Sequence, residues 1–475
     1  MNVPLTVFIG LEIHIHLKTE SKMFCSCPAR YGAEPNTNIC PICLGYPGTL
    51  PLLNKRAVAH GYLTARALGC RLLSSAAFAR KNYFYPDMSK NYQITQHSHP
   101  VGIDGAVEAD FGDAGIRKIR IHNVHLEEDA GKMIHADDAT LIDYNRAGYP
   151  LLEIVTEPDL SCGEEAELFL RDFQRLVRYL AVSDGNMEEG SMKCDANISV
   201  NQPGKGLGTK VELKNMNSPR FVRLALNYEM RRQSKLLESG GEIVQETRLW
   251  NENRDTTEAM RRKETPDDYR YFPEPDMPSF TADAEFLREI ENRLVELPLA
   301  KKQRFQSEYN LKDEQAEFIH NDIAMAALFE DTVKLGASVR DVAAWLSSDV
   351  RKLLNREGRP LADTGLSASR FSSLLALINQ GRISGKIAKS VLEKVFLEDA
   401  DPEAIVERGN LFQISDSIEL GRIVNEAVSR NPSVVESISR GNLKQKGWLM
   451  GEIMRLSGGR AAPELARKIL DERIG

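Results

Sequence analysis

Strict alternation of apolar and polar residues recurs in the first part of this chain and constrains its fold more than any other feature. Between Ile9 and Lys18, apolar residues at the odd positions alternate with Gly10 and polar residues at the even positions. Side chains of a β-strand point to opposite faces in turn, so the pattern predicts a strand with one buried face. Glu12, His14 and His16 are therefore expected on the same polar face.

The alternation returns in two later segments, residues 192–200 and 210–214. Each segment is expected to gather its polar side chains on one face: Lys193, Asp195, Asn197 and Ser199 in the first, and Lys210, Glu212 and Lys214 in the second. Between these strands, Ser161 with Glu164 predicts a capping box ahead of a helix that runs to about Leu180. Ser218-Pro219 opens another helix, which Gly240-Gly241 closes.

The apolar period changes to that of helices after the Pro-rich stretch 272–278. Leu374, Leu375, Leu377 and Ile378, for example, mark one amphipathic helix. A chain of 475 residues holds two to four domains on a prior of roughly 100–200 residues each. We predict an α+β fold, with a β-rich domain and antiparallel sheet over residues 1–280, an all-α helical linker domain over 281–330 and a helical tail over 331–475.

Charge and hydropathy exclude some classes of protein. The formal net charge is −7, and the composition, with 42% hydrophobic and 27% charged residues, is that of an ordinary globular chain. No segment approaches the roughly 20 apolar residues of a membrane span, and the start does not resemble a signal peptide. We therefore expect a cytoplasmic protein.

Basic residues gather locally near the end of the chain although the whole chain is acidic. A local patch can bind phosphate in such a chain. The alternative is a solvated helical surface. The residues are Arg430, Arg440, Lys444, Lys446 and Arg455.

Four of the seven cysteines stand in two tight pairs, Cys25-Ser26-Cys27 and Cys40-Pro41-Ile42-Cys43. In a cytosolic chain this grouping indicates tetrahedral Zn²⁺ rather than disulfides. Four thiolates leave no coordination position for a substrate, so the predicted role is structural. Thiols without a ligand are the alternative.

Acidic side chains lie in apolar surroundings in two further predicted strands. If the strand containing Ile119 and Ile121 continues, His125, Glu127 and Asp129 share one side, and Glu153 has apolar neighbours. A buried carboxylate needs a cation or hydrogen-bond donors, and Mg²⁺ is one such cation. A solvated sheet face is the alternative for any one strand.

Lysines beside these acids favour a site for phosphoryl transfer, in which metal and Lys neutralise oxygen charges. The chain has no Walker-A motif, and the glycine-rich segment 204–208 is more simply a hairpin turn. The residues alone thus predict a metal-assisted site on a sheet, without identifying its substrate.

Several long motifs resemble one known family, the B subunits of the bacterial and organellar aspartyl/glutamyl-tRNA amidotransferases. The resemblance covers essentially the whole chain. The motifs that carry it are residues 9–14, 80–87, 126–132, 187–199, 212–215 and 268–276.

The resemblance implies a cradle-like kinase domain, a helical domain and a tail that holds tRNA. It implies that ATP and Mg²⁺ phosphorylate the side-chain carboxylate of glutamate or aspartate misacylated onto tRNA. Ammonia released from glutamine by an amidase A subunit then gives the amide, and a small C subunit completes the heterotrimer.

The resemblance also implies roles for individual residues, by matching motifs. Glu12, His14 and Glu127 are the expected magnesium and catalytic residues, with Glu153 and Asp195 as further catalytic candidates. Cys25, Cys27, Cys40 and Cys43 match the zinc-bearing members of the family. The expected phosphate contacts are Lys81, Lys193, Lys214 and Arg248.

Two other functions remain open at this stage. A zinc-containing tRNA-binding module would explain the cysteines and the tail but not the acid and lysine strand faces. A ligase that amidates a free small molecule would use those faces but not the tail. The pattern does not distinguish Glu-tRNA from Asp-tRNA as the substrate.

Overall fold

The computed structural model describes residues 5–262 and 266–474. It divides into two compact units, Met1–Lys301 and Lys302–Gly475. Within the described residues, no helix is both long and apolar enough to cross a membrane.

The first unit is built on a 12-stranded sheet whose main path runs β14-β13-β12-β11-β1-β10-β7-β5-β4-β15, with β6 pairing to β7 and β2 to β6. Every pair is antiparallel except β12 with β13, a parallel pair that the predicted antiparallel sheet did not include. The strands are β1 (Thr6–His16), β2 (Arg71–Leu72), β4 (Ala79–Asn82), β5 (Tyr92–Thr95), β6 (Gly102–Asp110), β7 (Ile116–Glu128), β10 (Pro150–Thr156), β11 (Met192–Asn201), β12 (Val211–Lys214), β13 (Glu246–Asn251), β14 (Thr256–Arg262) and β15 (Phe272–Pro273).

Two separate two-stranded pairs lie outside this sheet. They are β3 (Ser75–Ala76) with β16 (Phe280–Thr281), and β8 (Lys132–His135) with β9 (Thr140–Asp143).

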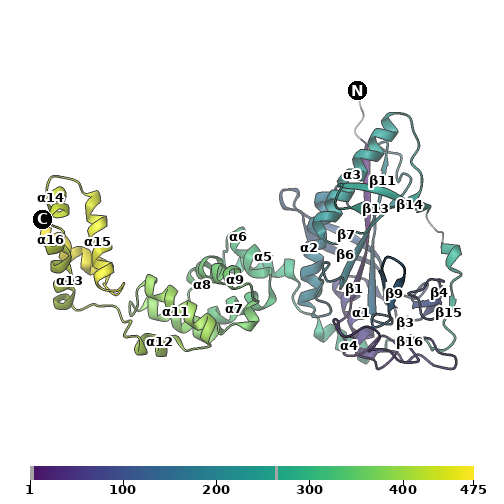
Figure 1. Cartoon of the computed structure of the whole chain (residues 1–475), viewed down its shortest axis with the longest axis horizontal. Coiled ribbons are helices and arrows are strands. Elements are labelled where there is room, and N and C mark those ends of the chain that lie inside the picture. Colours follow the sequence, from purple (N-terminus) through teal and green to yellow (C-terminus); the bar gives the residue numbers. More distant parts are fainter. Residues whose placement is uncertain (1–4, 263–265, 475) are drawn as a thin grey trace. The chain divides into compact units, whose positions relative to one another are not determined.

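One face of the sheet is covered by helices and forms the core of the unit. The helices α1 (Lys55–Ala67), α2 (Gly163–Tyr179) and α3 (Pro219–Glu238) pack on this face, and α4 (Ala284–Arg293) packs on α1 (Figure 1). Ile9, Leu11, Ile13 and Ile15 of β1 are buried here. The apolar half of the predicted alternation is therefore confirmed as the core-facing half.

The sequence predicted the start of α3 correctly but not the start of α2. Ser218 caps α3 by accepting a hydrogen bond from the Phe221 amide, as expected. The capping box of Ser161 with Glu164 is wrong, because α2 begins one residue later and the Ser161 amide and hydroxyl both donate to Glu165.

The second unit is helical, and its helices enclose two separate apolar clusters. The first cluster runs from Phe305 to Val406 and the second from Ile414 to Leu470. The helices are α5 (Pro298–Glu308), which spans the division between the units, α6 (Asp313–His320), α7 (Ile323–Lys334), α8 (Val339–Trp345), α9 (Arg351–Glu357), α10 (Ala368–Asn379), α11 (Gly385–Glu398), α12 (Pro402–Arg408), α13 (Ser417–Arg430), α14 (Pro432–Ser439), α15 (Lys444–Leu456) and α16 (Pro463–Ile474).

The change from β-rich to helical structure is confirmed. The domain boundaries at 280 and 330 stay predictions, and the second of them would divide α7.

Candidate active site and cysteine cluster

The polar face of the sheet carries a cavity of about 680 Å³. Strands far apart in the sequence supply its lining, because β10 inserts between β1 and β7 and β11 lies on the other side of β1. The charged residues are the carboxylates Glu12, Glu127, Asp129, Glu153, Asp195 and Glu212, with the lysines Lys81, Lys193, Lys210 and Lys214.

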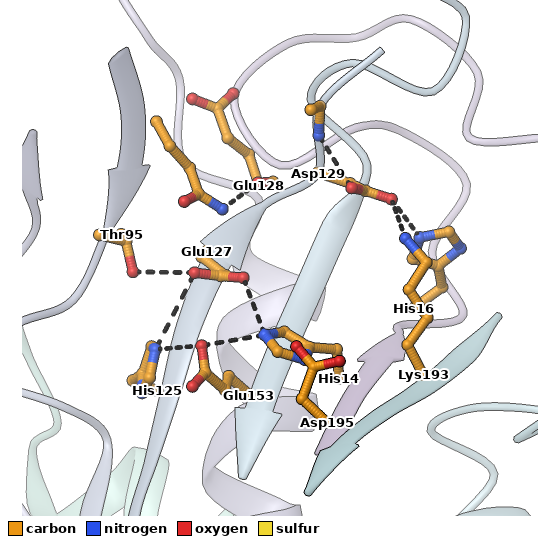
Figure 2. A network of polar contacts seen from close by, with 12 residues as sticks. His14, His16, Thr95, His125, Glu127, Glu128, Asp129, Glu153, Lys193 and Asp195 are labelled. Carbon is orange, nitrogen blue, oxygen red and sulfur yellow. Dashed lines mark hydrogen bonds and ion pairs between the residues drawn. The ribbon is translucent and has the colours of Figure 1, made fainter. Parts of the chain in front are cut away.

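A first group of side chains surrounds Glu153 on the central strand β10. Strand register places His14 of β1 and His125 of β7 directly opposite it, one on each side. Both imidazole Nε2 atoms lie 3.1 Å from the Glu153 carboxylate, and His14 Nε2 is also 3.8 Å from Glu127 Oε1. Thr95 Oγ1 donates to the other oxygen of Glu127 at 3.1 Å. Figure 2 shows these side chains pointing toward one another.

Charge complementarity decides the protonation of this group. Burial on its own would lower the pKa of His14, but Glu153, Glu127 and Asp195 outweigh it and raise the pKa to about 9. Burial acts against ionisation of Glu153, yet His125 and His14 hold its pKa well below the usual range. Without a metal ion, His14 and Glu153 are therefore an imidazolium–carboxylate pair.

A second group lies across β1, β11 and β12. Glu12 is paired in register with Asp195, and Asn197 of the same strand donates to Glu12 Oε1 at 2.8 Å. Lys214 forms an ion pair with Asp195 and lies 3.5 Å from Glu212. Burial would lower the pKa of Lys214, but these two acids raise it, so the ammonium remains charged.

Asp129 forms a third group at the end of β7. It accepts a 2.7 Å hydrogen bond from His16 and lies 3.2 Å from Arg146 and 3.7 Å from Lys193. Burial would raise the pKa of Asp129, but Lys193, Arg146 and His16 keep it well below normal. Figure 2 shows Asp129, His16 and Lys193 of this group apart from His14 and Glu153.

Two of these groups have the geometry of a cation site. The ligand atoms of His14, Glu127 and Glu153 lie within 4.8 Å of one another, and so do those of Glu12, Asp195 and Glu212. The second group offers only oxygen ligands, which Mg²⁺ prefers. In the first group His14 must lose its proton before it can bind a metal ion.

Eight of the nine predicted catalytic and phosphate-binding residues line this one cavity. The exception is Arg248. Its neighbour Thr247 faces the cavity, so Arg248 points to the opposite side of β13, where Glu246 and Thr257 bind its guanidinium. The prediction that Arg248 contacts phosphate in this cavity is therefore corrected, because its side chain lies outside the cavity lining.

The predicted magnesium set of Glu12, His14 and Glu127 stays a prediction, and its members fall into two groups. The structure divides it, placing His14 and Glu127 with Glu153, and Glu12 with Asp195 and Glu212. The physical reason is register, because β10 brings Glu153 between β1 and β7, on the side of β1 away from β11.

Sequence reasoning did not select several residues that the cavity contains. Alternation had already placed Glu212 beside Lys214, and His125 beside Glu127, but gave no reason to join either to Glu12 or His14. Tyr269 and Tyr271 lie within the family motif 268–276, but no alternation marked them as site residues, because the strand next to them, β15, has two residues.

The four paired cysteines form a cluster away from this cavity's lining. Their sulfur atoms lie within 4.8 Å of one another, and the Sγ atoms of Cys40 and Cys43 are 3.9 Å apart. A tetrahedral Zn²⁺ with bonds of about 2.3 Å separates its sulfurs by roughly 3.8 Å. All seven cysteines are free of disulfides, so this donor set fits a tetrahedral metal ion.

A fully buried lysine beside the cluster supports an anionic ligand set. Lys22 is 0% exposed, and its Nζ lies 3.6 Å from Cys43 Sγ and 3.3 Å from the Tyr144 carbonyl. Among the described residues no carboxylate lies within ion-pair distance of it. A buried ammonium needs a counter-charge, and the thiolates provide one.

Burial and hydrogen bonds among the four cysteines set the protonation of their thiols. A hydrogen bond from Cys25 lowers the pKa of Cys43 to about 4 against the effect of burial, with help from the Cys40 amide and Lys22. A hydrogen bond to Cys43, together with burial, raises the pKa of Cys25, and burial raises that of Cys27 to about 11. Only a bound cation would ionise the whole set.

The basic residues predicted to bind tRNA lie on α13, on α15 and after α14. Four of them already pair with acids: Arg430 with Glu426, Arg440 with Glu436, Arg455 with Glu452, and Lys446 with Asp471. Lys444 has no ion pair among the described residues. The side chains of the three arginines are 56–77% exposed. Exposed ion pairs of this kind contribute little free energy, so a phosphate group can replace the acids as the partner of these arginines.

Comparisons with known proteins match both units. The GatB/GatE catalytic domain matches residues 7–288, and the GatB domain matches residues 327–474. Two relatives are each named as the B subunit of aspartyl/glutamyl-tRNA(Asn/Gln) amidotransferase. The relative from Thermoanaerobacter pseudethanolicus is 46% identical to this chain over 468 residues, and the relative from Carboxydothermus hydrogenoformans is 43% identical over 472 residues. A third of the same name, from Geobacter sulfurreducens, is 43% identical, and each alignment covers 98% of both chains.

Proposed function

We propose that this chain, which belongs to the family of aspartyl/glutamyl-tRNA(Asn/Gln) amidotransferase B subunits, activates a carboxylate in the cavity on the polar face of its sheet. Its substrate is glutamate or aspartate misacylated onto the tRNA for glutamine or asparagine. The product is the corresponding amide, still attached to the tRNA.

The chemistry requires two steps. An oxygen of the side-chain carboxylate attacks the γ-phosphorus of ATP, and ADP leaves. Ammonia then attacks the carbonyl carbon of the acyl phosphate, inorganic phosphate leaves with the C–O bond electrons, and the nitrogen loses a proton. Phosphorylation is needed because a carboxylate oxygen is a poor leaving group and phosphate is a good one.

The single observation that supports this chemistry is the gathering of six carboxylates and four lysines around one cavity. A triphosphate beside a substrate carboxylate brings a large negative charge. Lys81, Lys193 and Lys214 are the residues to which we assign neutralisation of phosphate oxygens, since phosphoryl transfer depends mainly on positioning and on charge.

The acids of the two groups would hold Mg²⁺: Glu12, Asp195 and Glu212 in one, and Glu127 and Glu153 with His14 in the other. When bound, Mg²⁺ supplies neutralisation of the β- and γ-phosphate oxygens. In the group of acids that includes His14, His125 orients Glu153 and Thr95 orients Glu127. Asn197 orients Glu12 in the same way.

We assign a structural role to zinc bound by Cys25, Cys27, Cys40 and Cys43. Four thiolates complete its coordination, so no substrate can bind to it. The remaining parts of the proposal are an amidase A subunit that releases ammonia from glutamine, a small C subunit, and action in the cytoplasm.

A three-arm assay tests the function. The chain is co-purified with the amidase and small subunits and supplied with glutamine. We expect amide formation on misacylated tRNA with ATP, and none on the free amino acid or without ATP. Amide formation on the free amino acid would instead indicate a small-molecule ligase, and binding of tRNA without any amide would indicate a binding module.

We assign tRNA binding to the last helices, which carry Arg430, Arg440, Lys444, Lys446 and Arg455. Deleting the chain after Phe412 removes the second apolar cluster of the helical unit as a whole, whereas a cut near 330 would divide α7. We expect the truncated protein to bind charged tRNA more weakly, while glutamine hydrolysis by the partner, measured without tRNA, stays largely unchanged.

Salt dependence supplies the control for this deletion. Each phosphate contact contributes about 0.7–0.9 to the slope of log K against log salt. The truncated form should therefore show a shallower slope. Lys444→Ala alone should reduce the magnitude of the slope by less than about one, the contribution of a single phosphate contact. Equal affinity and equal slopes for both forms would leave these residues as a solvated surface.

A further inference from the structure

Six aromatic side chains, which we call the aromatic rim, lie on the segments around β4 and β15, at one end of the main sheet path. Four of the rings form two near-neighbour pairs, Tyr83 with Tyr85 at 5.6 Å and Tyr269 with Tyr271 at 6.1 Å. The members of the rim are Tyr83, Phe84, Tyr85, Tyr269, Tyr271 and Phe272.

Part of the aromatic rim is unusually exposed. Phe84 is 68% exposed, Tyr85 46% and Phe272 44%. A large apolar ring is normally buried, and a cluster of exposed rings marks a binding surface.

Basic side chains lie among these rings. Lys81 Nζ is 4.8 Å from the centre of the Tyr269 ring, and Arg270 Cζ is 5.5 Å from the centre of the Phe84 ring. Rings interleaved with Lys and Arg are the surface that unpaired nucleotides use, because every base can stack and every phosphate can pair with a cation.

The aromatic rim continues into the cavity. Lys81, Tyr83, Tyr269 and Tyr271 line the same cavity as the acids, whereas Phe84 and Phe272 do not. The surface thus leads from outside the cavity to the carboxylate groups.

The local backbone holds the rim in place. The Asn82 side-chain amide donates to the carbonyls of Tyr269 and Arg270 at 3.3 and 2.7 Å. Arg270 has φ of 45°, a left-handed conformation that is costly for this residue type. Tyr271 stacks on His97 with ring centres 4.2 Å apart. These contacts aim Tyr269 and Tyr271 into the cavity before any ligand arrives.

We propose that the aromatic rim binds the unpaired 3′ end of the aminoacylated RNA, stacking its bases on the way to the cavity. This inference rests on the proposed function, in which the reacting carboxylate is carried by the terminal ribose of a tRNA. Stacking on Phe84 and its neighbours delivers that carboxylate to the acids and lysines, and Arg270, which lies outside the cavity lining, pairs with an RNA phosphate.

The test uses the complex assembled with its amidase partner and two RNA hairpins with the acceptor-stem sequence. One hairpin ends in the unpaired 3′ tail and the other is blunt. We expect the wild type to bind the tailed hairpin more tightly. Phe84→Ala should reduce this preference by about 5- to 140-fold, the range for one base–ring stack, and Phe84→Trp should retain it.

Tyr31→Ala is the matched control, because Tyr31 is 82% exposed, lies on the cysteine-bearing segment and does not line the cavity. It should leave the preference for the tail unchanged. An unchanged preference in Phe84→Ala overturns the inference. So does weaker assembly of Phe84→Ala with the amidase partner and unchanged RNA binding, which would make the rim a protein interface.

Amidation of charged tRNA by the wild-type complex separates this inference from the proposed function. If the wild type forms no amide, the proposed function fails. If it forms amide and Phe84→Ala retains full preference for the tailed hairpin, only the aromatic rim is wrong.

Discussion

Glu127→Gln is expected to abolish ATP-dependent amide formation while the protein still folds and assembles with its amidase partner. Glu127 is 4% exposed, accepts a hydrogen bond from Thr95 and lies 3.8 Å from His14. The glutamine oxygen can keep the bond to Thr95, but a neutral amide facing His14 cannot replace a carboxylate as a metal ligand. Loss of several kcal/mol of charge stabilisation should lower the rate by at least about a hundredfold.

The measurement is amide formation on misacylated tRNA, with thermal unfolding and co-purification of the partner as tests of folding. Glu108→Gln is the matched control, since Glu108 is an exposed residue of β6 that does not line the cavity. It should retain normal activity. Normal amidation by Glu127→Gln would remove Glu127 from the site.

Cys40→Ser is expected to lower both bound zinc and thermal stability. Closed thiolate sites contribute folding free energy, and the buried ammonium of Lys22 would face a weaker counter-charge after the loss of one thiolate. Loss of a few kcal/mol should lower the unfolding temperature by on the order of 5–10 °C. Activity should fall only at temperatures at which the variant unfolds.

Zinc content by elemental analysis and unfolding by calorimetry check this result. Cys162→Ser serves as the control, because Cys162 precedes α2 at its N-cap, where serine is favoured, and lies outside the cluster. A purified wild-type chain that is stable and active without any bound zinc would contradict the assignment.

Some features of the site follow from short-range sequence alone. The period of two in a strand is a local property, so the shared polar face of Glu12, His14 and His16 could be predicted without the fold. The spacing of the two cysteine pairs likewise predicted the cluster of four cysteines.

Long-range strand pairing could not be read from these local patterns. Glu153 lies between His14 and His125 only because β10 inserts between β1 and β7, and Glu212 joins Glu12 only because β11 lies between β1 and β12. Such neighbours depend on which distant strands bury the most apolar surface together, and no segment contains that information by itself.

Arg248 shows the same limit within one strand. Segment 246–251 lacks regular alternation, so nothing local tells which side Arg248 takes. The packing of α3 against β14 decides it, because Glu229 of α3 and Thr257 of β14 bind each other and lie beside the guanidinium. The sequence by itself thus determined which residues can share a face and which cysteines can share a metal ion. Only the tertiary structure decided which faces meet, because strand order and register are properties of the packed sheet and not of its separate strands.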